Sequence, residues 1–152
     1  PVSIAASVLG SGRLSGASDD SLTKRLAPKA FATAGITPED LDVIEVHDAT
    51  SPSEIITLIE LGICPGHDAA RWIDEGWLEV DGRCPTNTSG GLASKGHPIG
   101  ATGLGQVHEI VTQLRGAAGA RQVKDANIGL THNGGGILGT DAAAMAIHVF
   151  KR

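Results

Sequence analysis

The sequence contains no tyrosine, and aromatic residues account for only 3% of its 152 residues. The missing tyrosine removes one candidate acid–base side chain, and the small residues that stand in place of aromatics favour close packing of helices on a sheet. Cysteine occurs only as Cys64 and Cys84, without CxxC spacing. We therefore expect two separate small thiols in a reducing cytosol.

The chain also lacks a long apolar run and any cluster of lysine and arginine. No segment approaches the length of a membrane span, so we expect no membrane contact, no signal peptide and a cytoplasmic location. The net charge of −5 argues against nucleic acid as a partner. With 41% hydrophobic and 19% charged residues, the composition is that of one globular domain. Because the chain begins at Pro1 within a strand-like segment, we expect it to be part of a larger unit.

Hydrophobic periodicity divides the chain into strands and helices. Apolar and β-branched patterns predict strands at 2–9, 41–47, 127–131 and 142–150. Helical spacing predicts helices at 21–34, 51–62, 68–75 and 101–118, the second with Ser51 as its N-cap and Pro52 in its first turn. This order predicts a single α/β domain built in layers.

The most informative segment is the glycine-dense stretch 87–103, which holds one histidine, His97, and leads directly into the last predicted helix. Glycines packed this densely let a backbone approach another group closely. Histidine is the side chain best suited to moving protons near neutral pH. The segment therefore indicates an enzyme active site.

Two other segments carry candidate chemistry. His47 ends a predicted strand just before a helix, and the segment 132–136, which begins with His132 and Asn133, is predicted as the loop that joins the last two strands. Ligands of open α/β sheets bind outside strand ends and beside helix N-termini, so all three segments are candidates for one pocket. Taken singly, each histidine has a structural explanation and the glycines a tight-turn explanation. Neither the histidine spacing nor the glycine pattern favours a metal or nucleotide-triphosphate site.

The segment 87–103 closely resembles the histidine motif of the thiolases. Its pattern is Asn-x-x-Gly-Gly-x-x-x-x-Gly-His-Pro-x-Gly-x-Thr-Gly, from Asn87 to Gly103. Across residues 1–152 the chain resembles a thiolase C-terminal domain. Glu-Val-His-Asp at 45–48 and Thr-His-Asn at 131–133 are similar to the sterol-carrier-protein-type and archaeal branch.

This resemblance implies a layered half of the thiolase fold, with a mixed five-stranded-type sheet and helices on both faces. It implies acyltransferase chemistry on a 3-ketoacyl-CoA, with coenzyme A as co-substrate and no covalently bound cofactor. An N-terminal half, in the same polypeptide or a separate chain, would supply the acylated cysteine and the loop domain. The expected partners are that half, an acyl-CoA substrate and further copies in a homo- or hetero-oligomer.

The resemblance also assigns roles to individual residues. His97 would activate the cysteine, and His47 would join it in an oxyanion site for the enolate. The backbone N–H of Gly134 would contribute to a second oxyanion site. The motif positions expected to contact substrate or CoA are Asn87, Gly90, Gly91, Ser94 and Gly135. No metal is expected.

The chain departs from the family pattern where a proton-shuttling cysteine is usual. His132 occupies the position of the Cys-x-Gly cysteine, and Ala49 and Thr50 replace the last two residues of His-Asp-Cys-Phe. His132 is then the available base for α-proton transfer, with an imidazole pKa suited to it. Two other functions stay open: a thiolase-like retro-aldol lyase acting on a β-hydroxyacyl-CoA, and a non-catalytic acyl-CoA-binding assembly subunit.

Overall fold

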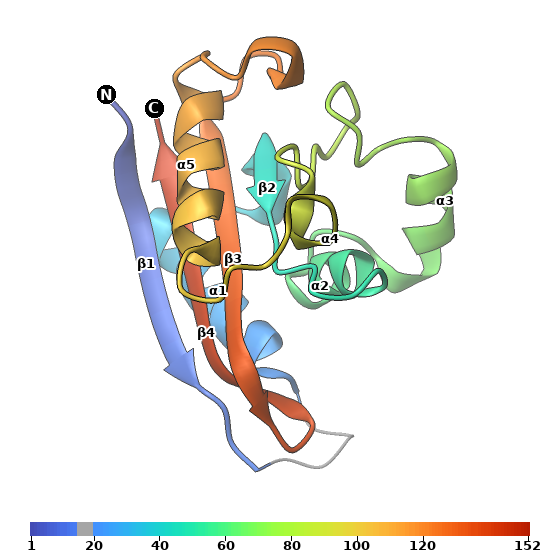
Figure 1. Cartoon of the computed structure of the whole chain (residues 1–152), viewed down its shortest axis with the longest axis vertical. Coiled ribbons are helices and arrows are strands. Elements are labelled where there is room, and N and C mark those ends of the chain that lie inside the picture. Colours follow the sequence, from blue (N-terminus) through green and yellow to red (C-terminus); the bar gives the residue numbers. More distant parts are fainter. Residues whose placement is uncertain (15–19) are drawn as a thin grey trace.

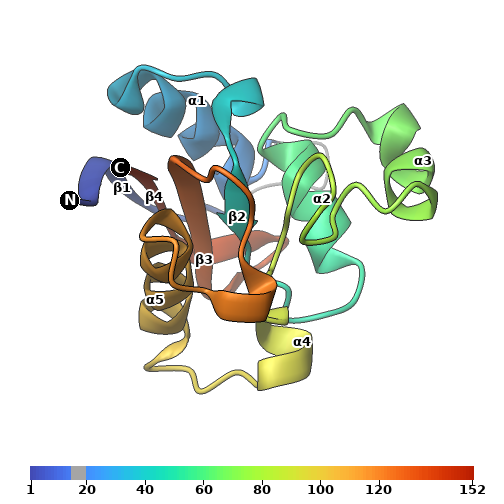
Figure 2. The same cartoon turned by 90° about the horizontal axis from the view of Figure 1, so that it is seen from above.

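The computed structural model describes residues 1–14 and 20–152, which form one mixed sheet with helices packed on both of its faces (Figures 1 and 2). The strands are β1 (Ser3–Ser11), β2 (Val43–Glu45), β3 (Ile128–Leu138) and β4 (Asp141–Lys151). The α-helices are α1 (Leu22–Ala34), α2 (Ser53–Glu60), α3 (Ala69–Asp74), α4 (Gly91–Lys95) and α5 (Thr102–Leu114). This arrangement confirms the predicted α/β class.

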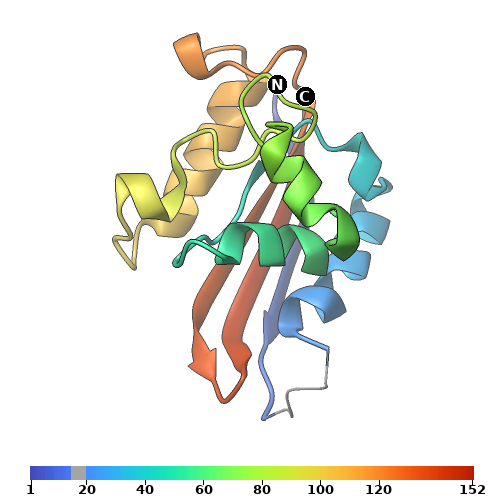
Figure 3. The ribbon, with the colours of Figure 1, turned by 90° about the vertical axis from the view of Figure 1, so that its right-hand side faces the viewer.

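The sheet order is β1-β4-β3-β2. Strands β1 and β3 both run antiparallel to β4, and β2 runs parallel to β3. The sequence pattern assigned four strands, and the described residues form four; the fifth strand implied by the resemblance has no counterpart among them. Figure 3 shows the three long strands β1, β4 and β3 side by side, with α1 and α5 to either side of them.

Strand alternation builds two cores, one on each face of the sheet. Val149 of β4 packs in the core shared with α1 and α2, whereas its neighbour Phe150 packs in the core under α5. A side chain at Gly129 would meet Ile110 of α5, since a Cβ there lies only 2.6 Å from Ile110 Cγ2. A glycine in β3 therefore allows α5 to approach the sheet closely. Both cysteines are free and buried, consistent with two separate thiols.

The element boundaries differ from the prediction most at the functional segments. Residues 132–136 were predicted as a loop, and this is wrong: they lie inside β3, where Asn133 pairs with Ala146 and Gly134 with Met145. Pairing with Met145 and Ala144 of β4 overrides the turn preference of Gly134 and Gly135. The hairpin turn comes later, after Leu138.

The boundaries of β2, α2 and α5 also differ from those predicted from the sequence. Strand β2 ends at Glu45 because the next backbone N–H, that of Val46, donates to the side-chain oxygen of Asn87 instead of to a neighbouring strand. Helix α2 begins at Ser53, not Ser51, and Pro52 takes the N-cap position. Helix α5 ends at Leu114, earlier than the predicted residue 118, and Gly116 follows with a positive φ of 70°.

Candidate active site

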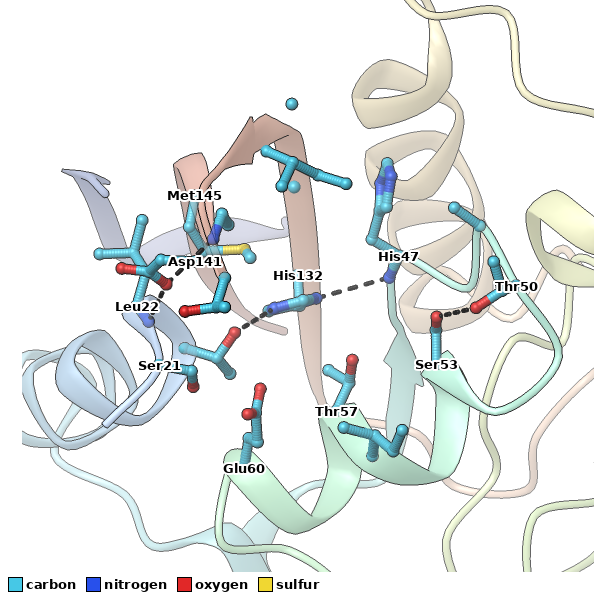
Figure 4. A pocket seen from close by; sticks show the side chains of 18 of the residues that line it. Ser21, Leu22, His47, Thr50, Ser53, Thr57, Glu60, His132, Asp141 and Met145 are labelled. Carbon is cyan, nitrogen blue, oxygen red and sulfur yellow. Dashed lines mark hydrogen bonds between the residues drawn. The ribbon is translucent and has the colours of Figure 1, made fainter. Parts of the chain in front are cut away.

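A cavity of about 540 Å³ lies where the segment after β2, the start of α1, α2 and the two strands of the β3–β4 hairpin meet (Figure 4). All four residues expected to act in catalysis line it: His47, His97, His132 and Gly134. The three histidine segments, which are far apart in the sequence, therefore meet at one cavity. The three segments line one pocket as expected, although His132 reaches it from within β3 and not from a strand end.

His97 and His47 form a ring pair at this cavity. Their centroids are 4.9 Å apart and their planes are almost perpendicular, at 87°. The Thr102 hydroxyl, in the first turn of α5, lies 2.7 Å from His97 Nδ1 and donates to the carbonyl of Pro98. We adopt the assignment in which the Thr102 proton lies on Pro98, so that the Thr102 oxygen accepts the Nδ1 proton of His97. Nε2 of His97 then carries the lone pair of a base.

A chain of amide side chains fixes the opposite tautomer in His47. Gln106 donates from Nε2 to the backbone carbonyl of His132, at 3.1 Å, so its Oε1 must accept. Asn133 donates from Nδ2 to that Oε1 at 3.1 Å, and the same amide group lies 3.3 Å from Nδ1 of His47. Since a backbone carbonyl only accepts, it sets the direction of the whole chain, and His47 Nδ1 accepts. Nε2 of His47 therefore carries a proton and is a donor.

His47 is neutral in this environment. Burial lowers its pKa, and the neighbouring His97 lowers that pKa further, against an opposing effect of Asp48. The Nε2–H of the neutral His47 next to Nε2 of His97 gives the cavity one hydrogen-bond donor and one base. The pair can stabilise an oxyanion and accept a proton.

His132 lies behind this pair and is 3% exposed. Its Nδ1 accepts the backbone N–H of His47 at 3.5 Å, and its Nε2 bonds the hydroxyl of Thr23 at 3.0 Å. Burial, with a smaller effect of His47, lowers the pKa of His132 to about 3. The expectation that this imidazole has a pKa suited to α-proton transfer is therefore wrong, because desolvation makes the ring a very weak base.

Gly134 lies in β3 opposite Met145 and beside His47. A Cβ at this position would lie 3.5 Å from Met145 Cε and 3.6 Å from His47 Cδ2. These are ordinary van der Waals distances, so the glycine leaves the cavity one methyl group wider on this side. The widening lies directly next to the donor ring.

The five residues expected to contact substrate or CoA do not line this cavity. Ser94 and Gly135 are exposed at other positions, in α4 and in β3. Asn87 is buried, with its Oδ1 accepting from Val46 at 2.9 Å and its Nδ2 donating to Glu54 at 2.6 Å. Asn87 therefore ties the histidine motif to the end of β2, next to His47.

Gly90 and Gly91 serve the start of α4, where the carboxylate of Asp48 is bound. The backbone N–H groups of Leu92 and Ala93 donate to Asp48 at 2.7 and 3.3 Å. Gly91 has φ of +62°, and a Cβ there would lie 2.1 Å from Asp48 Oδ2. The second glycine of the motif thus makes room for the residue that follows His47.

A buried carboxylate, Glu45, ties the same two segments together. It accepts from the backbone N–H of Ser89 at 3.0 Å and from the Ser89 hydroxyl at 2.6 Å, and it pairs with Lys95 at 3.3 Å. Burial raises the pKa of Glu45, against the lowering effects of Ser89 and Lys95. Asn87, Asp48 and Glu45 together connect β2 to the motif and so hold His47 in register with His97.

Sequence reasoning missed the residues that orient the histidines: Thr102, Gln106 and Asn133. A signal for the first two was present, because polar residues recur at 102, 106, 109 and 113 on the buried face of α5. Polar side chains at helical spacing on a buried face need internal partners. Asn133 stands in the Thr-His-Asn pattern at 131–133, and nothing in that pattern indicates its bonds to Gln106 and His47.

Within residues 1–14 and 20–152, no group of three or more histidine, cysteine or acidic side chains is arranged to hold a metal ion. In the same part of the chain, none of the helices has the length and apolar character needed to cross a membrane.

Comparison with known proteins places this site in a family context. Residues 18–148 match the family model described as thiolase C-terminal domain-like. An acetyl-CoA acetyltransferase of Methanothermobacter thermautotrophicus is 46% identical over 130 residues, which cover 86% of this chain and 33% of the relative. Human sterol carrier protein 2 is 48% identical over 112 residues, covering 74% of the chain and 20% of the relative.

A third relative, benzoylsuccinyl-CoA thiolase subunit BbsB of Thauera aromatica, is 33% identical over 90% of this chain and 37% of its own length. Among solved structures, the Ltp2-ChsH2(DUF35) aldolase matches 97% of this chain and 39% of its own, with a TM-score of 0.77 and 25% identity. The chain thus spans between a fifth and just over a third of the length of these curated relatives.

Proposed function

Because the chain belongs to the thiolase C-terminal domain-like family, we propose that it is the C-terminal half of an acyl-CoA acyltransferase. The reaction is Claisen or retro-Claisen chemistry on a 3-ketoacyl-CoA, with free coenzyme A as the co-substrate. An N-terminal half supplies the nucleophilic cysteine. The observation that carries the proposal is the His47–His97 ring pair, with its opposite tautomers, at the mouth of one cavity.

In the thiolytic direction, Nε2 of His97 accepts the proton of the cysteine thiol. The thiolate attacks C3 of the substrate, the C2–C3 bond breaks, and its electron pair forms the enolate of acetyl-CoA. Nε2–H of His47 and the protonated His97 donate to the enolate oxygen. The acyl group remains on the cysteine as a thioester until the thiol of coenzyme A displaces it.

The enolate must also gain a proton at C2. His132 is the base expected at the position of the usual cysteine, but its burial and its pKa of about 3 argue against this role. We assign the step to His97, which holds the thiol proton at that moment and lies in the same cavity. One histidine then moves one proton from sulfur to carbon, and no further acid is required.

Replacing His97 by Ala in the complete enzyme, with its N-terminal half, tests the proposal. We expect thiolysis to fall by at least about a hundredfold, since both a general base and an oxyanion donor are lost. His108→Ala, on α5 but outside the cavity lining, is the matched control and is expected to keep near-normal activity. Near-normal thiolysis by His97→Ala would refute the role.

A second candidate is a thiolase-like lyase that cleaves a β-hydroxyacyl-CoA by retro-aldol chemistry. The likeness to the Ltp2-ChsH2(DUF35) aldolase over 97% of the chain supports it. Here Nε2 of His97 accepts the proton of the 3-hydroxyl, the C2–C3 bond breaks, a carbonyl product leaves, and the enolate gains that proton at C2. Thiolysis consumes coenzyme A and retro-aldol cleavage does not, so a requirement for free coenzyme A separates the two.

A further inference from the structure

One face of α2 presents a polar stripe to the cavity. Ser53, Thr57 and Glu60 all line it and lie at i, i+4 and i+7, which is one side of a helix. Leu58, on another side of α2, is fully buried in the core shared with α1. From Ser53 to Glu60 the stripe extends about 10 Å along the helix axis, away from His47.

The middle residue of the stripe has an unused polar group. Thr57 is 6% exposed, and its hydroxyl has no hydrogen-bond partner among residues 1–14 and 20–152. By contrast, the hydroxyl of Ser53 bonds that of Thr50 at 2.6 Å. Figure 4 shows the Thr57 hydroxyl pointing from α2 into the cavity, toward His132. The buried polar atoms without a partner among the described residues are Trp72 Nε1 and Thr131 Oγ1, so the Thr57 hydroxyl is open to the cavity and is available to a group that enters from outside the chain.

Glu60, one turn further along α2, has a carboxylate that is also without a partner among the described residues. It is partly buried and has neither an ion pair nor a hydrogen bond with any described residue. The other carboxylate in the lining, Asp141, is already occupied: it pairs with Arg25 at 2.9 Å and accepts the N–H of Leu22 at 2.7 Å. Glu60 is therefore the acceptor that the cavity offers to a ligand.

The rest of the lining combines small and apolar side chains, such as Ile56, Met145 and Ala142, with an equal number of polar ones, such as Thr23 and Thr50. An acyl chain fits such a wall, and the stripe adds a point of polar recognition along its length. Resting on the proposed function, we infer that this site accepts acyl groups bearing a hydrogen-bond donor, a hydroxyl or an ammonium, that bonds Thr57 and Glu60. Unsubstituted alkyl chains are the poorer ligands.

The test measures binding by the complete protein, with its N-terminal half, so that it does not depend on turnover. The probes are unreactive CoA thioethers whose alkyl chains end in a hydroxyl, an ammonium or no polar group. The three kinds are compared at the same chain length, and the comparison is repeated for several chain lengths. Each is measured by isothermal titration calorimetry. We expect the best donor-bearing probe to bind roughly five- to tenfold more tightly than its unsubstituted counterpart, as one or two hydrogen bonds predict.

Variants identify the residues responsible. Thr57→Val and Glu60→Gln are each expected to reduce this preference at least about threefold, while Thr57→Ser, which keeps the hydroxyl, restores it. A larger effect of Glu60→Gln on the ammonium probe than on the hydroxyl probe identifies an ammonium as the preferred donor. Glu39→Gln, at an exposed carboxylate outside the cavity lining, is the matched control and leaves every affinity unchanged.

Equal or tighter binding of the unsubstituted probe at every chain length overturns the inference. So does a preference that survives in the double variant Thr57→Val, Glu60→Gln. Thiolysis is assayed separately on the same wild-type protein. If the wild-type protein does not catalyse thiolysis, the proposed function is contradicted. The binding preference can still be measured, because binding of the unreactive probes does not depend on turnover.

Discussion

Single hydrogen bonds decide the chemistry of this site, because they determine which nitrogen of each histidine carries a proton. Thr102 makes His97 a base at Nε2, and Asn133 makes His47 a donor at Nε2. Each assignment depends on a backbone carbonyl, which can only accept: Pro98 accepts from Thr102, and His132 accepts from Gln106. The two rings are alike in type and close in space, yet they are prepared for opposite tasks.

Replacing Asn133 by Asp tests the tautomer of His47. A carboxylate has nearly the same shape but donates nothing, so His47 turns its proton to Nδ1 and loses the donor at Nε2. We expect kcat of the complete enzyme to fall between about tenfold and a thousandfold, the range for one lost oxyanion donor. Asn127→Asp, at an exposed asparagine in the turn before β3, is the control and is expected to leave kcat unchanged. Unaltered kcat in Asn133→Asp would exclude this orienting role.

The buried His132 makes the fold sensitive to acid. Its pKa is about 3 in the folded chain against about 6.5 when exposed, so the unfolded chain binds more protons between these values. Its contribution to stability is complete above pH 6.5 and is lost as the pH falls toward 3. The expected slope is at most about 1.4 kcal/mol per pH unit, and His132→Gln should flatten it.

Urea unfolding of the chain at several pH values between 7 and 4 measures this slope. His67→Gln, whose side chain is 84% exposed, is the control and should keep the wild-type slope. If the acid dependence of His132→Gln matched that of wild type, the ring would not be the buried neutral group described here.

At the scale of elements, the site depends on how β2 and the histidine motif are joined. The short helix α4 starts on the carboxylate of Asp48, and Asp48 directly follows His47. Glu45 and Asn87 make the two other connections. The glycines of the motif therefore have a structural role. They let the segment 87–97 pack closely on Asp48 and Glu45, which places His97 beside His47.

Replacing Gly91 by Ala tests this joint. The added Cβ would lie 2.1 Å from Asp48 Oδ2 at a φ of +62°, so the cap of α4 must move. We expect the free energy of unfolding to fall by about 2 to 4 kcal/mol, from overpacking together with backbone strain. Gly96→Ala is the matched control, because its φ is +89° but nothing lies within 4 Å of the added atom.

The control isolates backbone strain, expected to cost about 1 kcal/mol or slightly more. Urea unfolding of both variants gives the comparison. An equal loss of stability in the two would mean that the contact with Asp48 carries no energy of its own.

These elements also show what the sequence predicts and what it cannot. The spacing of apolar residues predicts α1 and α5, whereas the short helix α4 inside the glycine-dense stretch 87–103 is not predicted. The glycines at 134–136 predict a turn, but pairing with Met145 and Ala144 of β4 keeps Gly134 and Gly135 in β3. The direction of the Gln106–Asn133–His47 chain depends on a backbone carbonyl brought near by folding, and no local pattern encodes it.

At the scale of the whole molecule, the proposed function makes this chain one side of a site that an N-terminal half completes. His97 is exposed, and two apolar side chains near it, Ile99 at 88% and Leu104 at 74%, are exposed as well. These two side chains are therefore the candidates for a contact with the proposed N-terminal half. An N-terminal half seated on this end of α5 would bury both and bring its cysteine to His97.

Replacing Leu104 by Asp tests this contact. We expect association with a separately produced N-terminal half to weaken at least about tenfold, because a charge would be buried against an apolar surface. Ile73→Asp on α3, 57% exposed in wild type and away from α5 in Figure 1, is the control and should bind normally. Normal association of Leu104→Asp, measured by calorimetry, would place the contact elsewhere.

The most direct test is to look for the acyl-enzyme in the complete protein. A 3-ketoacyl-CoA is supplied without free coenzyme A, and the mass of the N-terminal half is measured by mass spectrometry. We expect one acyl group to be added to the nucleophilic cysteine in the wild type. In His97→Ala we expect little or none over the same time. Acylation at the wild-type rate without His97, or carbon–carbon cleavage in the wild type with no covalent adduct, would contradict the proposed function.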